Sequence, residues 1–144
     1  MAARRSTPAD AGVLAASLLV DACQTDPENS LRLEVVSSLA LDLGRRLETL
    51  ARDDSAGSLV EAALACADLA TLAACNLQAL SDDNGLLAAA AAQLAAGTTR
   101  ALIPLVELEA GALDETGAEN TLRDARSARW RADVAVRQVE GSQD

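Results

Sequence analysis

Carboxylates are the main side chains in this sequence that could do chemistry, because the chain contains no histidine, no lysine and no tyrosine. Two acidic pairs interrupt the apolar stretches, Asp53-Asp54 and Asp82-Asp83. A carboxylate can transfer a proton when burial raises its pKa towards neutrality, and the same group can cap the N-terminus of a helix. Capping explains both pairs more simply. The absence of imidazole excludes the usual hydrolytic triads.

Polar side chains also border the alanine-rich stretches. Asn76 and Gln78 follow one such stretch, and if they are buried they must hydrogen-bond to a loop, a neighbouring helix or a ligand. Farther along, one side of a predicted helix carries Arg123, Arg126, Trp130 and Arg137. That side could bind an acidic partner or an anionic ligand, but interleaved aspartates favour a solvent-exposed, ion-paired face.

The composition defines the fold class. Alanine and leucine together supply 57 of the 144 residues, against nine valines, one isoleucine and one tryptophan. Alanine and leucine are strong helix formers and the usual strand builders are scarce, so the sequence predicts an all-α fold. Twenty-two acidic residues and twelve arginines give a formal charge of −10. Such a surface repels nucleic-acid backbones and anionic membranes, and we expect neither as a partner.

The cysteines carry no metal or disulfide signature. Cys23, Cys66 and Cys75 are odd in number and have no CxxC spacing and no histidine companion, so we expect no metal site. Cys66 and Cys75 lie among alanines and are predicted to be small, buried side chains. Free cysteines of this kind are typical of a protein in the reducing cytosol. A proline and acidic residues interrupt the N-terminal apolar stretch, unlike an export signal. The most apolar stretch, residues 86–96, is shorter than the roughly 20 residues of a spanning helix, so we expect a cytoplasmic protein without transmembrane helices.

Helix start and stop signals divide the first half of the chain. Thr7 followed by Pro8 predicts a helix that ends near residue 24. Asp26-Pro27-Glu28 repeats the pattern and predicts a second helix that ends near residue 52. The apolar residues of this second helix recur at helical spacing: Leu31, Val35, Leu39, Leu43, Leu47 and Leu50.

The second half is predicted to form three or four more helices. Asp53-Asp54-Ser55 can cap a helix over residues 56–80. A fourth helix from residue 86 meets Pro104, which should kink it or end it at Ile103, because proline lacks a backbone donor. Thr116 and Glu119 have capping-box spacing for a last helix that ends before Gly141. One face of the third helix would carry Leu59, Ala63, Cys66, Ala70, Ala73 and Leu77.

These segments predict one domain over residues 1–144, an antiparallel bundle of five to six helices with an Ala/Leu-rich core. Residues 1–6 and 141–144 are expected to be flexible ends. The alanine runs at 62–74 and 88–96 offer more close-packing surface than a monomer of this size hides easily. We therefore expect a homo-oligomer, with a dimer as the first choice. The alternative is a compact monomer whose alanines fill its centre.

Three segments resemble the cyclodeaminase and cyclohydrolase family, the small helical dimers that process formimino- or methenyl-tetrahydrofolate. Residues 7–16, TPADAGVLAA, are similar to the family's entry segment, with its glycine-rich turn represented by Gly12 alone. Residues 47–55, LETLARDDS, resemble the stretch that ends in a proton-transferring aspartate. Asn76 through Ser81-Asp82, followed by the alanine-rich residues 86–96, resembles the family's Asn…Ser-Asp segment.

This resemblance implies a hydrolase or deaminase whose substrate is a tetrahydrofolate derivative, with no covalently bound cofactor. It assigns proton transfer to Asp54. It also implies that Asn76, Ser81 and Asp82 shape a ligand pocket at a subunit interface, and that Gly12 contributes the turn.

Two hypotheses remain open. The first is the folate enzyme, which we rank first because it explains the order of the segments. The second is a non-catalytic helical subunit or adaptor, which pairs with itself or with a larger protein partner through its alanine-rich faces. The absent histidine, the reduced glycine turn and the acidic surface favour this second hypothesis.

Overall fold

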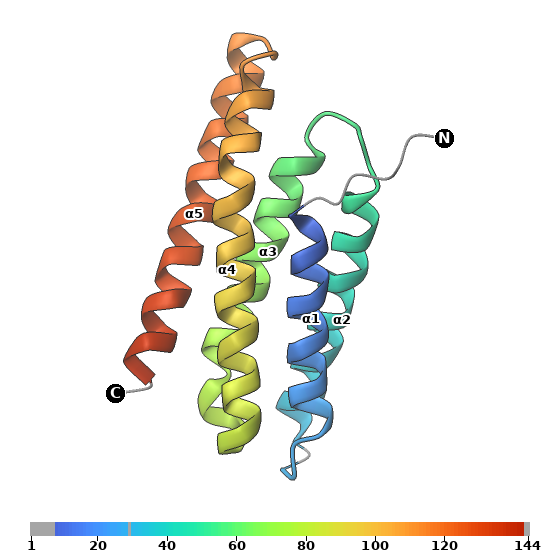
Figure 1. The fold of residues 1–144 in the computed structure, drawn as a ribbon, viewed down its shortest axis with the longest axis vertical. Helices are drawn as coiled ribbons and strands as arrows, with labels where there is room; N and C mark the ends of the chain where they lie inside the picture. The colour runs from blue at the N-terminus through green and yellow to red at the C-terminus, as the bar shows by residue number, and fades with distance from the viewer. Residues whose placement is uncertain (1–7, 29, 143–144) are drawn as a thin grey trace.

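Five α-helices joined by short polar connections make up the part of the chain that the structure describes, a computed structural model covering residues 8–28 and 30–142 (Figure 1). Consecutive helices run in opposite directions, so the fold is all-α and an antiparallel bundle, as predicted. α4 lies at the front of the bundle between α5 and α1, with α3 behind it and α2 beside α1. The helices are α1 (Ala9–Gln24), α2 (Leu31–Ala51), α3 (Ser58–Cys75), α4 (Asp82–Ala110) and α5 (Glu115–Ser142), with a 3₁₀ turn, η1 (Leu77–Ala79).

The core consists of small side chains at close helix spacing. A Cβ added at Gly12 would lie 2.7 Å from the Cys66 Sγ and 3.0 Å from a Leu47 methyl, and one added at Gly44 would lie 2.9 Å from the Ala16 Cβ. Contacts this short require glycine at both positions. The core is therefore the tightly spaced Ala/Leu core that the composition predicts. Its largest fully buried side chains are Leu19, Leu33, Leu47, Leu69 and Leu102.

The start of the second helix is a correction to the sequence analysis. α2 begins at Leu31, not at Pro27, and its N-cap is Ser30, whose hydroxyl accepts a hydrogen bond from the Leu33 N–H at 3.3 Å. Its buried face also differs from the predicted stripe, because Leu31 and Val35 are exposed. Leu47 is the one residue of that stripe that is fully buried, and the buried residues of α2 are Leu33, Val36, Ser37, Ala40, Gly44, Leu47 and Ala51.

The later boundaries also differ in part from the predictions. α3 ends at Cys75 rather than near residue 80, and Cys75 is exposed rather than buried. α4 continues through Pro104 to Ala110. Pro104 lies on the solvent side of the helix, where water can satisfy the carbonyl that loses its donor. The prediction that the helix could end at Ile103 was therefore wrong.

The last helix starts one residue before the predicted capping box. The Asp114 carboxylate accepts a hydrogen bond from the Gly117 N–H at 2.7 Å, so Asp114 caps α5 and Thr116 lies inside its first turn. α5 runs through Gly141 to Ser142 and does not end before Gly141. Of the predicted flexible ends, 1–6 and 141–144, residues 141–142 belong to α5, whereas residues 1–6 and 143–144 lie outside the described residues, as does Thr7.

Two helices, α3 and α4, are long and apolar enough to cross a membrane by length and composition alone. In both, 56% of the apolar window is buried inside the bundle, and a core helix passes the same test. The expectation of a cytoplasmic protein without membrane-spanning segments stays a prediction.

Candidate functional site

The upper end of the bundle in Figure 1 carries Asp54, in the connection between α2 and α3. Asp54 is exposed and lines a shallow cavity of about 180 Å³ together with Glu109. The Glu109 carboxylate accepts a hydrogen bond from the Gly57 N–H at 2.7 Å, and Gly57 has φ of +90°, a conformation that favours glycine. The proton-transfer role of Asp54 would need partial burial, which this exposed position does not supply.

The neighbouring Asp53 organises the same connection. Its carboxylate accepts a hydrogen bond from the Ser55 N–H at 2.8 Å, and its carbonyl accepts one from the Ser58 hydroxyl at 3.0 Å. The Ser55 hydroxyl and N–H together hold the pKa of Asp53 below its usual value. The first acidic pair therefore shapes a turn and does not cap the helix as predicted, because the N-cap of α3 is Gly57 and no side chain forms a capping hydrogen bond there.

The lower end of the bundle is built around Asp26, which the sequence analysis used only as a helix start. Asp26 is 6% exposed, and its two carboxylate oxygens accept hydrogen bonds from three donors. These donors are the Ser81 N–H at 2.8 Å, the Glu28 N–H at 3.0 Å and the Asn84 amide at 3.2 Å. The Ser81 N–H is the main cause that lowers the pKa of Asp26. Asp26 thus ties the α1–α2 connection to the start of α4.

Asn76, which follows the last residue of α3, is buried, and both polar atoms of its side chain are hydrogen-bonded. Its amide oxygen accepts a hydrogen bond from the Arg32 Nε at 2.7 Å, and its amide nitrogen donates one to the Leu72 carbonyl at 2.7 Å. A second Arg32 nitrogen donates to the Cys75 carbonyl at 3.1 Å. A buried Asn76 was expected to bond to a loop, a neighbouring helix or a ligand, and its partner Arg32 belongs to a neighbouring helix, α2. Gln78 is exposed.

Ser81 and Asp82 lie at the start of α4, and both are exposed. They line a cavity of about 340 Å³ together with Gln78, Leu86 and other residues. This volume falls in the lower part of the range of small-molecule sites. It is the one described cavity in which two of the predicted ligand-binding residues meet.

The structure does not bring the predicted site residues together within one chain. Asp54 precedes α3 and Asn76 follows it, so the 18 residues of α3 separate them by about 27 Å. Gly12 belongs to neither end, since it is buried against Leu47 and Cys66. A single site that combines Asp54 with Ser81 and Asp82 would need a second chain, and the buried Gly12 would not be part of it.

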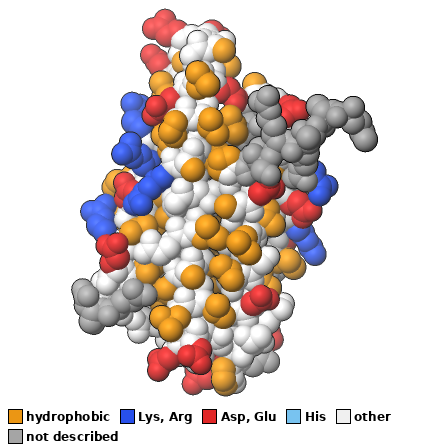
Figure 2. Space-filling view, viewed as in Figure 1, with side chains coloured by type: hydrophobic (Ala, Val, Ile, Leu, Met, Phe, Trp, Pro, Cys, Tyr) orange, Lys and Arg blue, Asp and Glu red, His pale blue; other side chains and the backbone are white. Residues whose placement is uncertain are grey.

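The exposed face of α4 carries few charges along most of its length. Between Asn84 and Val106 the helix carries one charged residue, Arg100. We call the following exposed residues the α4 face: Leu86, Ala90, Gln93, Gly97, Ala101, Pro104 and Leu108. Figure 2 shows hydrophobic side chains down the middle of the surface formed by α4 and α1, with most of the visible arginines at its two edges.

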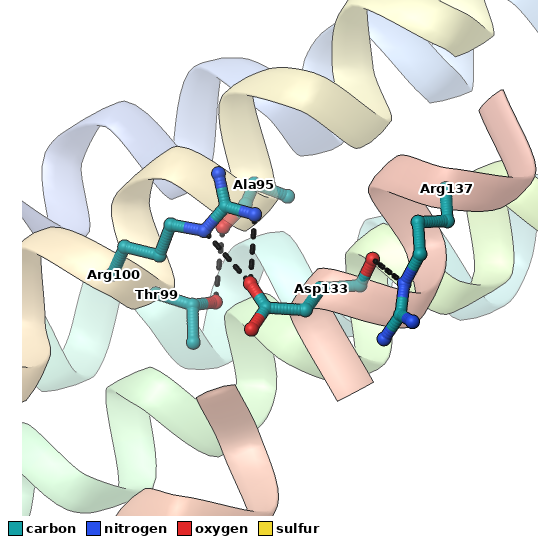
Figure 3. Close-up of polar contacts among 5 residues, drawn as sticks. All are labelled: Ala95, Thr99, Arg100, Asp133 and Arg137. Carbon is teal, nitrogen blue, oxygen red and sulfur yellow. Dashed lines mark hydrogen bonds and ion pairs between the residues drawn. The ribbon is translucent and has the colours of Figure 1, made fainter. Parts of the chain in front are cut away.

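Arg100 is held away from this face by α5. Its Nε and one terminal nitrogen donate to the same Asp133 oxygen, at 3.0 and 2.7 Å (Figure 3). The Asp133 carbonyl also accepts a hydrogen bond from the Arg137 Nε at 3.4 Å. The Thr99 hydroxyl donates to the Ala95 carbonyl of its own helix at 3.0 Å. The polar groups of Thr99 and Arg100 are therefore occupied inside the chain, and the α4 face is uncharged, with Gln93 as its one polar side chain.

A second groove runs between α4 and α5, with a volume of about 430 Å³. Arg126 and Arg129 line it, and neither forms a hydrogen bond or ion pair with another described residue. Ion pairing on α5 is thus partial: Arg123 pairs with Asp124 at 3.8 Å, and Asp133 pairs across to Arg100. Glu107 also lines the groove, and its negative charge would repel an anionic ligand.

Comparison with known proteins adds no relative. No family model, no curated protein and no solved structure matches this chain. Among the described residues there is no group of three or more acidic or cysteine side chains placed to hold a metal ion. The function is therefore argued from the geometry of the bundle alone.

Proposed function

We propose that this protein is a non-catalytic helical subunit that assembles through the α4 face. One observation carries the proposal. The chain has a charge of −10, yet one side of the 29-residue helix α4 has almost no charged side chains. Leu86 and Leu108 are 62% and 78% exposed on that side. Burying large apolar side chains of this kind is what drives most protein association.

Light scattering on the purified protein tests the proposal, with two leucine variants as a matched pair. Leu108 on α4 and Leu31 on α2 are 78% and 75% exposed, so replacing either with serine removes a similar apolar surface. We expect an assembled wild type, a Leu108→Ser variant that associates at least tenfold more weakly, and an unchanged Leu31→Ser variant. A monomeric wild type, or equal effects of both changes, would contradict the proposal.

The folate hypothesis remains a second proposal, supported by the cavity of about 340 Å³ that Ser81 and Asp82 line. Under it, the protein binds a tetrahydrofolate derivative there and Asp54 of another copy transfers the proton. Loss of methenyl-tetrahydrofolate absorbance tests this activity. The expected result is turnover that Asp54→Asn abolishes, and a rate equal to buffer with no thermal shift by any folate would exclude it.

A further inference from the structure

We infer that the partner of the α4 face is a second copy of the chain, with the two α4 helices antiparallel and crossing at Gly97. This inference rests on the proposed assembly function and adds the identity and the register of the partner.

The α4 face has a symmetry that suits such a pair. Leu86 and Leu108 lie eleven residues on either side of Gly97, Ala90 and Pro104 lie seven, and Gln93 and Ala101 lie four. In a two-fold interface, residue i contacts residue j of the partner and j contacts i. A two-fold axis at Gly97 therefore places Leu86 opposite the partner's Leu108 at both ends of the contact.

Side-chain size along the face also fits a crossing at its centre. A Cβ at Gly97 would meet no atom within 4 Å, so nothing in the chain itself requires glycine there. Glycine in a helix interior costs about 0.5–1 kcal/mol relative to alanine. A close approach of a second backbone at Gly97 supplies a reason for it, with Ala90 and Ala101 small on either side and the leucines at the ends.

The contact area reaches what a stable dimer needs. Leu86 to Leu108 spans about 33 Å along the helix at 1.5 Å per residue. With α1 packed alongside at 8–10 Å, the strip is roughly 20 Å wide, or about 650 Å² per copy and 1,300 Å² in total. Specific interfaces bury more than about 1,000 Å². Leu14, 56% exposed on α1, adds to the apolar surface.

Charge favours α4 over the other exposed apolar stripe. Leu31, Val35 and Leu39 on α2 alternate with Arg32 and Glu34 over nine residues. Between Leu86 and Leu108, α4 carries two charged residues, Arg100, which pairs with Asp133, and Glu107, which lines the groove beside α5. Each copy carries a charge of −10, so two copies repel unless the contact excludes carboxylates. The α4 face is the described surface that does so over its whole length.

Disulfide crosslinking at Gly97 tests the register. Helices 10 Å apart, with Cα atoms about 2.3 Å from each axis, place residues on the contact line about 5 Å apart, which is disulfide distance. The variant Gly97→Cys is made in a Cys75→Ser background, because Cys75 is the exposed native thiol among three. Ser38→Cys, on the exposed side of α2, is the control.

We expect mild oxidation to convert most of the Gly97→Cys protein to a covalent dimer and at most a few per cent of the Ser38→Cys protein. A protein that is dimeric by light scattering but does not crosslink at Gly97 would overturn this register and leave the proposed function standing. A monomeric protein would overturn both. Crosslinking of Leu86→Cys only with Leu108→Cys, in a mixture of the two, is the second expected result.

Discussion

The lower end of the bundle and the α4 face use their side chains in opposite ways. At the lower end, Asp26, Asn76 and Asn84 are buried, and each bonds to a segment distant in sequence. On the α4 face the leucines and small residues are exposed, and a Cβ added at Gly97 would meet no atom within 4 Å. These buried polar residues, of which Asn76 was a predicted site residue, hold the fold together, while the α4 face is the surface that we propose for a partner.

The largest expected effect comes from the core that supports both regions. Leu69 is fully buried, and Leu69→Ala should lower the free energy of unfolding by about 2–5 kcal/mol, because it leaves a cavity between closely packed helices. Urea denaturation at low protein concentration measures this. Leu108→Ala on the α4 face should change the same quantity by less than about 0.5 kcal/mol. Similar losses for both variants would remove the distinction between core and face.

Two glycines sharpen the comparison at a smaller scale. Gly12→Ala should destabilise the chain by about 1–3 kcal/mol, because its Cβ would lie 2.7 Å from the Cys66 Sγ. Gly97→Ala should stabilise the monomer by about 0.5–1 kcal/mol, since its Cβ meets open space. Thermal unfolding at low protein concentration measures both changes: the melting temperature should fall for Gly12→Ala and rise for Gly97→Ala. Destabilisation by Gly97→Ala would show that the α4 face is packed within the chain.

The pH dependence of stability tests the role of Asp26. Because the Ser81 N–H lowers the pKa of this carboxyl, the folded protein binds the proton less readily than the unfolded chain. The stabilisation is present above the ordinary pKa of about 3.9 and is lost as the pH falls through the lower folded value. Asp26→Asn should therefore lower the melting temperature at pH 7 and flatten its fall towards pH 3. A variant with the same acid profile as the wild type would contradict this role.

The smallest expected effect is that of salt on association. Acidic residues lie at both ends of α4, so antiparallel pairing brings carboxylates of two copies near each other. Raising the ionic strength from 0.01 to 0.15 M shortens the Debye length from about 30 to about 8 Å and screens this repulsion. The dimer should then become severalfold tighter by sedimentation equilibrium. Weakening by salt would indicate that ion pairs, rather than the apolar face, hold the copies together.

Helix content and core type were predictable because they depend on local propensity and composition. The start of α2 was not, because Asp26-Pro27 has the local pattern of a helix start but its carboxylate bonds to residues 81 and 84. The buried side of α2 depends on the close contact of Gly44 with Ala16, which periodicity alone does not show. Which predicted site residues meet depends on the direction of α3, so a list of candidates from the sequence could not reveal that they lie at opposite ends.

The central claim is tested most directly by the molar mass in solution of two variants, each with a glutamate in place of one glycine. Gly97 and Gly141 both lie in helices with open space for a Cβ, so a glutamate is tolerated at either position in the monomer. We predict that the wild type and Gly141→Glu have twice the chain mass of 14.8 kDa, and that Gly97→Glu has the mass of one chain. A dimeric Gly97→Glu protein, or a monomeric wild type, would contradict assembly through the α4 face.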